Sequence, residues 1–213
     1  MTVQVTLVQI ATLAPNCRTS YRTAFASGQP VLDSFDISAN PLRVAHFMAQ
    51  ILHESQAFTI QVENLNYSAQ RLPVVWSTRF KPKGPLDPSL FAHNPERLAN
   101  EVYGHRMGNV APGDGFLYRG RGLLQTTGKD SYIEATKTMR SSAPDAPDFT
   151  VTPDDVFGSD WCLKVAASEW VSKGCNELAD KDDITMITQR INGGQTGIGE
   201  RKEWARRTKF VWH

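Results

Sequence analysis

The chain has 213 residues, of which 40% are hydrophobic, and its 23 Lys and Arg against 22 Asp and Glu give a formal net charge of +1. This length and composition suit one sizeable domain, or two lobes that share a cleft. The balanced charge argues against nucleic-acid binding, which usually needs a strong basic excess; no run approaches the roughly 18 apolar residues of a membrane span, so stable membrane insertion is not expected.

The first 39 residues predict short helices. Residues 5–13 and 15–27 form the first two, and Gly28-Gln29-Pro30 separates them from a brief helical connector over residues 31–37. The segment Met1 to Pro15 has no basic residue before its mildly apolar run. We therefore expect no secretory signal peptide.

A longer, central helix is predicted from Pro41 to Glu54. Asn40 is a favoured N-cap residue, and proline suits the first helical position. Apolar residues recur through this segment at helical spacing, so the helix should be mostly buried with Glu54 at its C-terminal end. Burial and the negative end of the helix dipole both favour the protonated form of that carboxyl group.

Glu63 follows nine residues after Glu54. On one continuous helix the two residues would lie about 13.5 Å apart on opposite faces. The β-favouring residues 58–62 indicate that the helix stops, so both side chains can share a site. A buried acid and a second carboxylate on an extended segment suit general acid/base chemistry. The alternative is a surface glutamate beside an unrelated one.

The rest of the chain is expected to be mostly helical, and its only strand signal covers residues 58–67. Residues 81–88, 104–122 and 141–148 are expected to be loops, the second with six glycines in nineteen residues. The expected fold class is therefore mainly α with a small β element. Helices are predicted over residues 68–80, 94–103, 127–139, 160–173, 182–191 and 198–210.

Neither a metal nor a cofactor is expected. His53-Glu54 would open a zinc-protease helix only with a histidine four positions after His53, where Ala57 stands. The three cysteines, Cys17, Cys162 and Cys175, lack metal-type spacing and are odd in number, so they are expected to be reduced thiols of a cytosolic fold.

Glycine-rich residues 118–128 offer neutral hydrogen-bonding groups at Gln125 and Thr127, of the kind that hold a sugar hydroxyl or a water. Four motifs then occur in order: 47–55, 63–68, 118–127 and 191–194. Together they resemble glycoside hydrolase family 19, the plant and bacterial chitinase family, and especially its phage and prophage branch of endolysins. The resemblance covers about residues 40–210. It implies a lysozyme-like, two-lobed fold with a central cleft, in which residues 1–39 form an N-terminal helical segment packed on a catalytic domain of residues 40–213.

The resemblance also implies roles for single residues. By position, Glu54 resembles the general acid, Glu63 the general base and Thr127 the residue that holds the attacking water. Arg201 resembles an arginine that pairs with the acid, and His53 has a supporting position. Plant enzymes of the family usually carry an asparagine four residues after the water-holding position, and this chain has Ser131 there. The residues expected to bind substrate are Gln125, Asn192, Tyr67, Tyr132 and Ser131.

The expected reaction is inverting hydrolysis, in which two carboxyls roughly 6.5–9.5 Å apart leave room for a water. The short Glu54–Glu63 connection and the string from Glu63 to Ser68 resemble the endolysin branch. The expected substrate is therefore the peptidoglycan glycan strand, cut between N-acetylmuramic acid and N-acetylglucosamine. Such an enzyme would be a monomer held in the host bacterial cytoplasm until a holin opens the inner membrane, and would then act in the periplasm and cell wall.

Three other functions stay open at this point. A chitinase would cut β-1,4-linked N-acetylglucosamine polymers, and a lytic transglycosylase would need only one catalytic acid. An inactive glycan-binding protein or colicin-like partner domain would need neither glutamate. The basic, aromatic stretch 201–212 could contact anionic wall or outer-membrane lipid, or could be a solvated basic face over packed aromatic residues.

Overall fold

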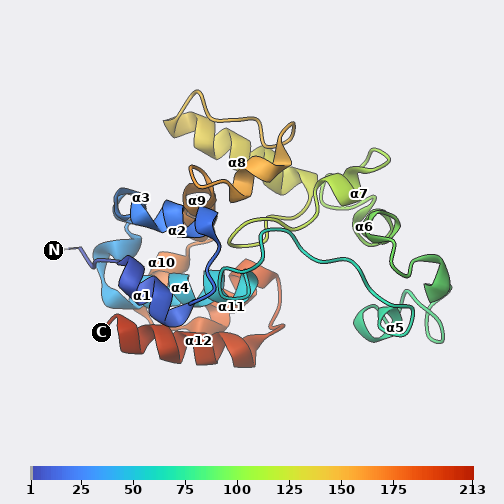
Figure 1. The fold of residues 1–213 in the computed structure, drawn as a ribbon, viewed down its shortest axis with the longest axis horizontal. Helices are drawn as coiled ribbons and strands as arrows, with labels where there is room; N and C mark the ends of the chain where they lie inside the picture. Colours follow the sequence, from blue (N-terminus) through green and yellow to red (C-terminus); the bar gives the residue numbers. More distant parts are fainter. Residues whose placement is uncertain (1) are drawn as a thin grey trace.

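The structure, a computed structural model, describes residues 2–213 and is mainly helical (Figure 1). Three short 3-10 turns accompany the α-helices: η1 (Ile37–Ala39), η2 (Pro88–Leu90) and η3 (Pro153–Phe157). The α-helices are α1 (Leu7–Leu13), α2 (Thr19–Ala26), α3 (Gln29–Ser34), α4 (Pro41–Glu54), α5 (Leu72–Val75), α6 (Pro95–Tyr103), α7 (Asp114–Leu117), α8 (Lys129–Ser142), α9 (Cys162–Ser172), α10 (Cys175–Asp180), α11 (Ile184–Asn192) and α12 (Ile198–Val211).

Helix α4 is the centre of the larger lobe, and α1 to α3 and α9 to α12 surround it (Figure 1). The side chain of Asn40 accepts a hydrogen bond from the Arg43 amide and Pro41 is the first helical residue, as expected. Every residue from 44 to 52 is buried. A helix buried on all sides can lie only inside a lobe, so its last residue emerges where that lobe ends.

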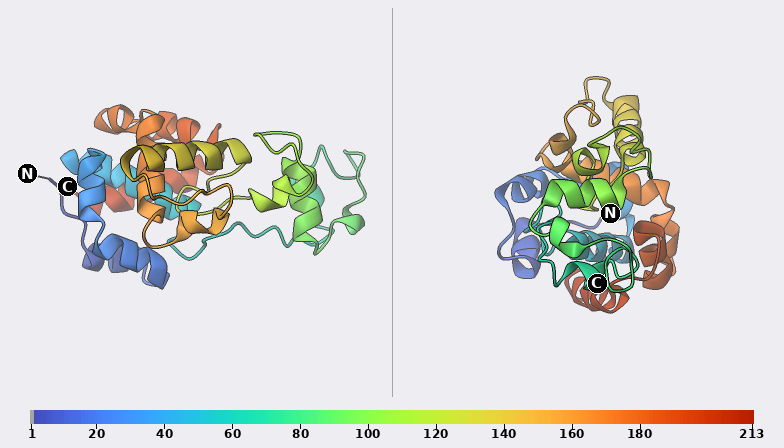
Figure 2. Two further views of the ribbon diagram at one scale, coloured as in Figure 1. Left: turned by 90° about the horizontal axis from the view of Figure 1, so that it is seen from above. Right: turned by 90° about the vertical axis from the view of Figure 1, so that its right-hand side faces the viewer.

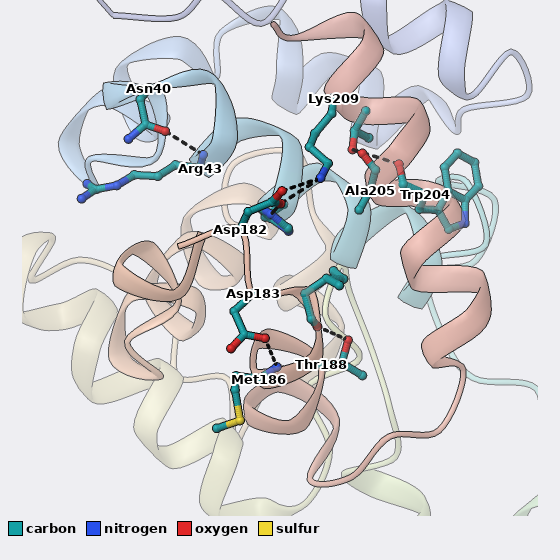
Figure 3. A network of polar contacts seen from close by, with 12 residues as sticks. Asn40, Arg43, Asp182, Asp183, Met186, Thr188, Trp204, Ala205 and Lys209 are labelled. Atoms are coloured by element: carbon teal, nitrogen blue, oxygen red, sulfur yellow. Dashed lines mark hydrogen bonds and ion pairs between the residues drawn. The ribbon is translucent and has the colours of Figure 1, made fainter. Parts of the chain in front are cut away.

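Helix α4 packs most extensively against α12, and polar side chains tie the two together. The buried His46 on α4 lies 2.6 Å, Nε2 to Oδ1, from Asp182, which precedes α11. Lys209 of α12 donates to both oxygens of Asp182 at 2.8 and 2.9 Å (Figure 3). The indole of Trp212 donates to the carbonyl of Gln4, which joins the two ends of the chain.

Residues 65–117 form a smaller lobe that extends away from α4 along the long axis of the molecule (Figure 2). It holds α5, α6 and α7 around a separate hydrophobic cluster. That cluster consists of Leu65, Leu72, Phe80, Phe91, Leu98, Ala99 and Val102. A third cluster, which includes Tyr118, Tyr132 and Phe149, packs α8 against α9. The mostly helical, two-lobed architecture is as expected.

The strand predicted over residues 58–67 is wrong. The described residues 2–213 contain only isolated bridges, one of them between Val62 and Arg121. Gln56, Ala57 and Phe58 have φ angles of 47°, 54° and 62°, so α4 ends in a left-handed turn. Phe58 is fully buried and its ring packs at 5.2 Å from Phe25. Anchoring this ring in the core outweighs both the local β preference and the strain of the turn.

Two helices differ from expectation. The predicted helix 68–80 is reduced to the single turn α5, because the chain bends after Val75 to bring Trp76 against Tyr67 at 5.1 Å. Helix α10 was not predicted; it begins directly after Gly174, which ends α9 with a φ of +64°. The expectation of unpaired cysteines is confirmed, since all three are free and buried. No helix of residues 2–213 is long and apolar enough to cross a membrane.

The burial of His46 predicts how stability depends on pH. Desolvation lowers the pKa of His46, Lys209 lowers it further, and Asp182 and Asp183 act in the opposite direction. The unfolded chain binds this proton near pH 6.5, and the folded chain binds it less readily. The free energy of unfolding should therefore fall as pH drops below about 6.5. Urea unfolding at about pH 7.5 and 5.5 measures this difference.

The variant His46→Gln should shrink that pH difference, whatever it does to stability at the higher pH. It should not abolish it, because burial also lowers the pKa of His53. His213→Gln, at an exposed histidine, is the control and should leave the difference unchanged. An equal difference in wild type and His46→Gln would contradict the prediction.

Candidate active site

An open pocket of about 360 Å³ lies between the C-terminal end of α4 and the extended segment that follows it. Four residues expected at the site line it together: Glu54, Glu63, Tyr67 and Gln125. The remaining lining residues are Gln56, Ile60, Asn64 and Asn66. An extended strand was expected to bring Glu63 into one site with Glu54. The left-handed turn after α4 has this effect instead, and both carboxylates line the same pocket.

Glu54 is paired with a buried arginine. Its carboxylate accepts a hydrogen bond from Nη2 of Arg201 on α12, and Nη1 of the same guanidinium bonds to Gln50, one turn earlier on α4. The side chain of Arg201 is 2% exposed and that of Glu54 is 17% exposed. A charge so deeply buried needs a partner and satisfied donors, and Glu54 and Gln50 supply them. The expected pairing of Arg201 with the acid is present in the structure.

The sequence argument from burial and the helix end was incomplete, because it did not include Arg201, whose guanidinium bonds directly to the carboxyl group of Glu54. One face of Glu54 is held by this pair and the other faces the pocket. His53 lies beside the pair, against the loop that leads into α12. A Cβ atom added at Gly197 would stand 2.7 Å from its Nε2, so this close approach needs a glycine there.

Glu63 is held from both sides. Its backbone amide donates to the carbonyl of Gly120 at 3.0 Å, and the amide of Gly120 donates back to Oε1 of Glu63 at 2.6 Å. Its other oxygen, Oε2, accepts a hydrogen bond of 2.8 Å from the hydroxyl of Tyr103. Each carboxylate oxygen keeps a second lone pair, so Glu63 can still accept a proton from a water in the pocket.

Three polar side chains converge over Gly120. A Cβ atom added there would stand 3.1 Å from Oε1 of Gln125, 3.1 Å from Oγ1 of Thr127 and 3.3 Å from Oε1 of Glu63. The hydroxyl of Thr127 donates to the carbonyl of Gln125 at 2.7 Å, which leaves its lone pairs free to accept. Such a group of acceptors beside a carboxylate can hold and orient a water.

No family model matches the chain. A glycosyl hydrolase family 19 domain-containing protein of Haemophilus influenzae is 39% identical over 165 residues, which is 76% of this chain and 76% of that protein. The chain belongs to glycoside hydrolase family 19.

Solved family 19 structures share the fold. Chitinase C of Streptomyces griseus superposes with a TM-score of 0.67 at 13% identity, over 98% of this chain and 92% of that one. A second bacterial family 19 chitinase gives a TM-score of 0.61 at 16% identity, over 98% and 94% of the two chains. At such identities the likeness establishes the fold alone.

Three residues expected to bind substrate in this family 19 cleft lie elsewhere. Tyr132 is fully buried, and its hydroxyl donates to the carbonyl of Arg119 and accepts a hydrogen bond from the guanidinium of Arg121. Its assignment to substrate binding is wrong, because it packs inside the protein and supports the glycine-rich loop. Ser131 lines a separate groove of about 270 Å³ between α8 and α9. Asn192 is an exposed residue at the end of α11 and does not line the pocket.

Two residues of the family 19 site were missed. Gln50 is a polar residue in the buried part of α4, and such a residue could have been recognised as a partner for a buried charge. Tyr103 is 40 positions from Glu63 in the chain, and no local pattern links them. No group of three His, Cys, Asp or Glu side chains among residues 2–213 is placed to hold a metal ion.

Gly120→Ala should greatly reduce hydrolysis with little loss of stability. The new methyl group would stand among the polar atoms of Gln125, Thr127 and Glu63 and fill the space in which these acceptors could hold a water. Gly120 is not in the left-handed region, so its backbone can accept alanine. Activity should fall about 100-fold or more, and the free energy of unfolding should change by less than about 1.5 kcal/mol.

Gly199→Ala, where an added Cβ atom meets nothing within 4 Å, is the matched control and should keep full activity. Steady-state rates and thermal unfolding of both variants make the comparison. A fully active Gly120→Ala enzyme would show that the reacting water does not lie over Gly120.

Arg201→Ala should destabilise the fold by about 3–5 kcal/mol, because it removes a buried, paired side chain and leaves the buried Gln50 and the partly buried Glu54 without their shared partner. Arg206→Ala removes an exposed arginine from the same helix, where it pairs only with Glu203, and should leave stability within experimental error. Urea unfolding at neutral pH compares the two. Equal effects would mean that the Arg201 pair is not a structural centre.

Proposed function

We propose that this family 19 glycoside hydrolase is a lysozyme of the endolysin type. It cuts β-1,4 bonds of peptidoglycan between N-acetylmuramic acid and N-acetylglucosamine by an inverting mechanism. The observation that carries the proposal is the pair of unlike carboxylates in one open pocket. Glu54 is paired with a buried arginine at a helix end, and Glu63 stands beside a group of water-binding acceptors.

In the proposed reaction, Glu54 donates its proton to the glycosidic oxygen as the bond to the anomeric carbon breaks. Glu63 takes a proton from a water held with Thr127 and Gln125, and the water oxygen attacks the anomeric carbon from the opposite face. Arg201 stabilises the negative charge that Glu54 acquires when it gives up its proton. One displacement turns a β-linkage into an α-configured product.

The endolysin assignment is supported by the short Glu54–Glu63 connection and by the string Glu63 to Ser68, of which three residues line the pocket besides Glu63. The alternative is a chitinase, and the similarity of the fold to two bacterial chitinases favours it. Both substrates present β-1,4-linked N-acetylated sugars, so the same two carboxylates serve either one. A lytic transglycosylase is less favoured, because it leaves Glu63 and its water-binding neighbours without a role.

The proposal includes the place of action. A monomer would stay in the host bacterial cytoplasm until a holin opens the inner membrane, and would then reach the cell wall. The three free, buried cysteines support a reducing compartment before release, because such thiols need no oxidant to complete the fold.

The test is to digest purified peptidoglycan and chitin separately and to identify the new reducing ends by mass spectrometry. We expect the new reducing ends from peptidoglycan to be N-acetylmuramic acid. They should form faster than the new N-acetylglucosamine reducing ends form from chitin. Proton NMR on a soluble substrate should show the α-anomer first. Glu54→Gln and Glu63→Gln should each lose several orders of magnitude in rate, roughly the share that acid/base catalysis contributes.

Each other outcome selects a rival. Faster release from chitin would make the enzyme a chitinase, and anhydro-muramic acid would make it a transglycosylase. A β-anomer appearing first would contradict the single displacement and the role of Glu63. Binding to peptidoglycan with no new reducing end would leave a glycan-binding protein.

A further inference from the structure

The base of the proposed mechanism has a hydrogen-bond donor from the opposite lobe. Glu63 precedes the small lobe in the chain, and Tyr103 ends α6 inside it. The phenol hydroxyl donates to Oε2 of Glu63 at 2.8 Å, while the amide of Gly120 donates to Oε1. The carboxylate is thus fixed at both oxygens by groups from two different parts of the fold.

Tyr103 is itself held in place. Its ring packs against the hydrophobic cluster of the small lobe. Its carbonyl accepts a hydrogen bond of 2.9 Å from the side chain of the buried Asn109, whose other end accepts one from the amide of Lys129 at the start of α8. The hydroxyl therefore cannot follow Glu63 if that side chain rotates, and the position of the small lobe sets the position of the carboxylate.

The phenol remains a donor at neutral pH. Burial raises the pKa of Tyr103, and the negative charge of Glu63 raises it further. A neutral hydroxyl that donates to a carboxylate favours the charged carboxylate and orients it. Tyr67 also lines the pocket, but its hydroxyl donates no hydrogen bond to Glu63. Within residues 2–213, Tyr103 is the one tyrosine whose hydroxyl bonds to this carboxylate.

We propose that Tyr103 is a positioning residue that holds the Glu63 carboxylate directed at the polar space over Gly120, and that it couples the base to the small lobe. The inference rests on the proposed function, since it gives Tyr103 a role through the base. Without this donor, Oε2 turns away from its bound orientation and the carboxylate takes up a proton more readily. The substrate still meets the same pocket walls.

The test is the pH dependence of hydrolysis by Tyr103→Phe, which removes one hydroxyl and keeps the ring. At the optimum, kcat should fall about 10- to 100-fold, as expected for one hydrogen bond to a charged group, with KM changed less than about twofold. The acid limb of the kcat/KM profile should move to higher pH, because the base is lost earlier as pH falls. The substrate is whichever glycan the wild type cuts.

Tyr118→Phe is the matched control. It also loses one tyrosine hydrogen bond, but that hydroxyl donates to the carbonyl of Thr150 inside a hydrophobic cluster and not to Glu63. It should keep the wild-type profile. An unmoved acid limb in Tyr103→Phe, or the same shift in both variants, would overturn the role of Tyr103.

A second measurement separates this inference from the proposed function. The side-chain carboxyl carbon of Glu63, labelled with ¹³C and assigned by its absence in Glu63→Gln, can be titrated by NMR without substrate. Its midpoint should rise in Tyr103→Phe and not in Tyr118→Phe. That result would stand even if the wild type cut neither glycan, and equal midpoints in all three proteins would reject the coupling.

Discussion

The buried guanidinium of Arg201 is the interaction on which the larger lobe depends. It bonds to Gln50 and Glu54, which stand one turn apart on the same face of α4, and so it fixes how α12 lies against that helix. A charge at 2% exposure cannot be left unpaired without a large cost. The bond that satisfies it also holds the carboxylate that would act as the acid. Stability and catalysis therefore meet in one group, and neither can be changed there alone.

Glu63 is the second residue at which separate parts of the fold are connected by hydrogen bonds. Its reciprocal bonds with Gly120 close the chain on itself across the whole small lobe, and Tyr103 reaches the same carboxylate from inside that lobe. Glycine is needed at 120 because a side chain would occupy the space among the surrounding polar groups. The two carboxylates thus have different supports: a cation from the core holds one, and neutral donors from the loop and the small lobe hold the other.

The sequence predicted best where a local signal decides the structure. Asn40 with Pro41, and Asn94 with Pro95, each cap and start a helix; α4 has the predicted bounds, and α6 begins one residue later than predicted and ends at the predicted Tyr103. The strand at 58–67 failed because the packing of Phe58 in the core, which joins distant segments, outweighs the local preference. A short sequence pattern contains no information about contacts between residues that are far apart in the chain.

The same division applies to the site. The resemblance placed Glu54, Glu63 and Gln125 in one pocket, since those positions carry the family motifs. It could not say which way Tyr132 faces, because a helix presents some residues to the core and others to the cleft. Tyr103 was out of reach for a different reason: its partner is 40 positions away, and only the folded lobe brings them together.

The small lobe leaves the main body at Glu63 and returns at Gly120, two residues 57 positions apart that hydrogen-bond directly to each other. Its ends are thus pinned independently of what it contains. Doubling the length of such an excursion adds only about 0.6 kcal/mol of closure entropy. Evolution can therefore lengthen, shorten or replace this insertion and so reshape one wall of the cleft for a new glycan. Any replacement that keeps the present support of Glu63 would still have to return a hydroxyl, or another neutral donor, to its carboxylate.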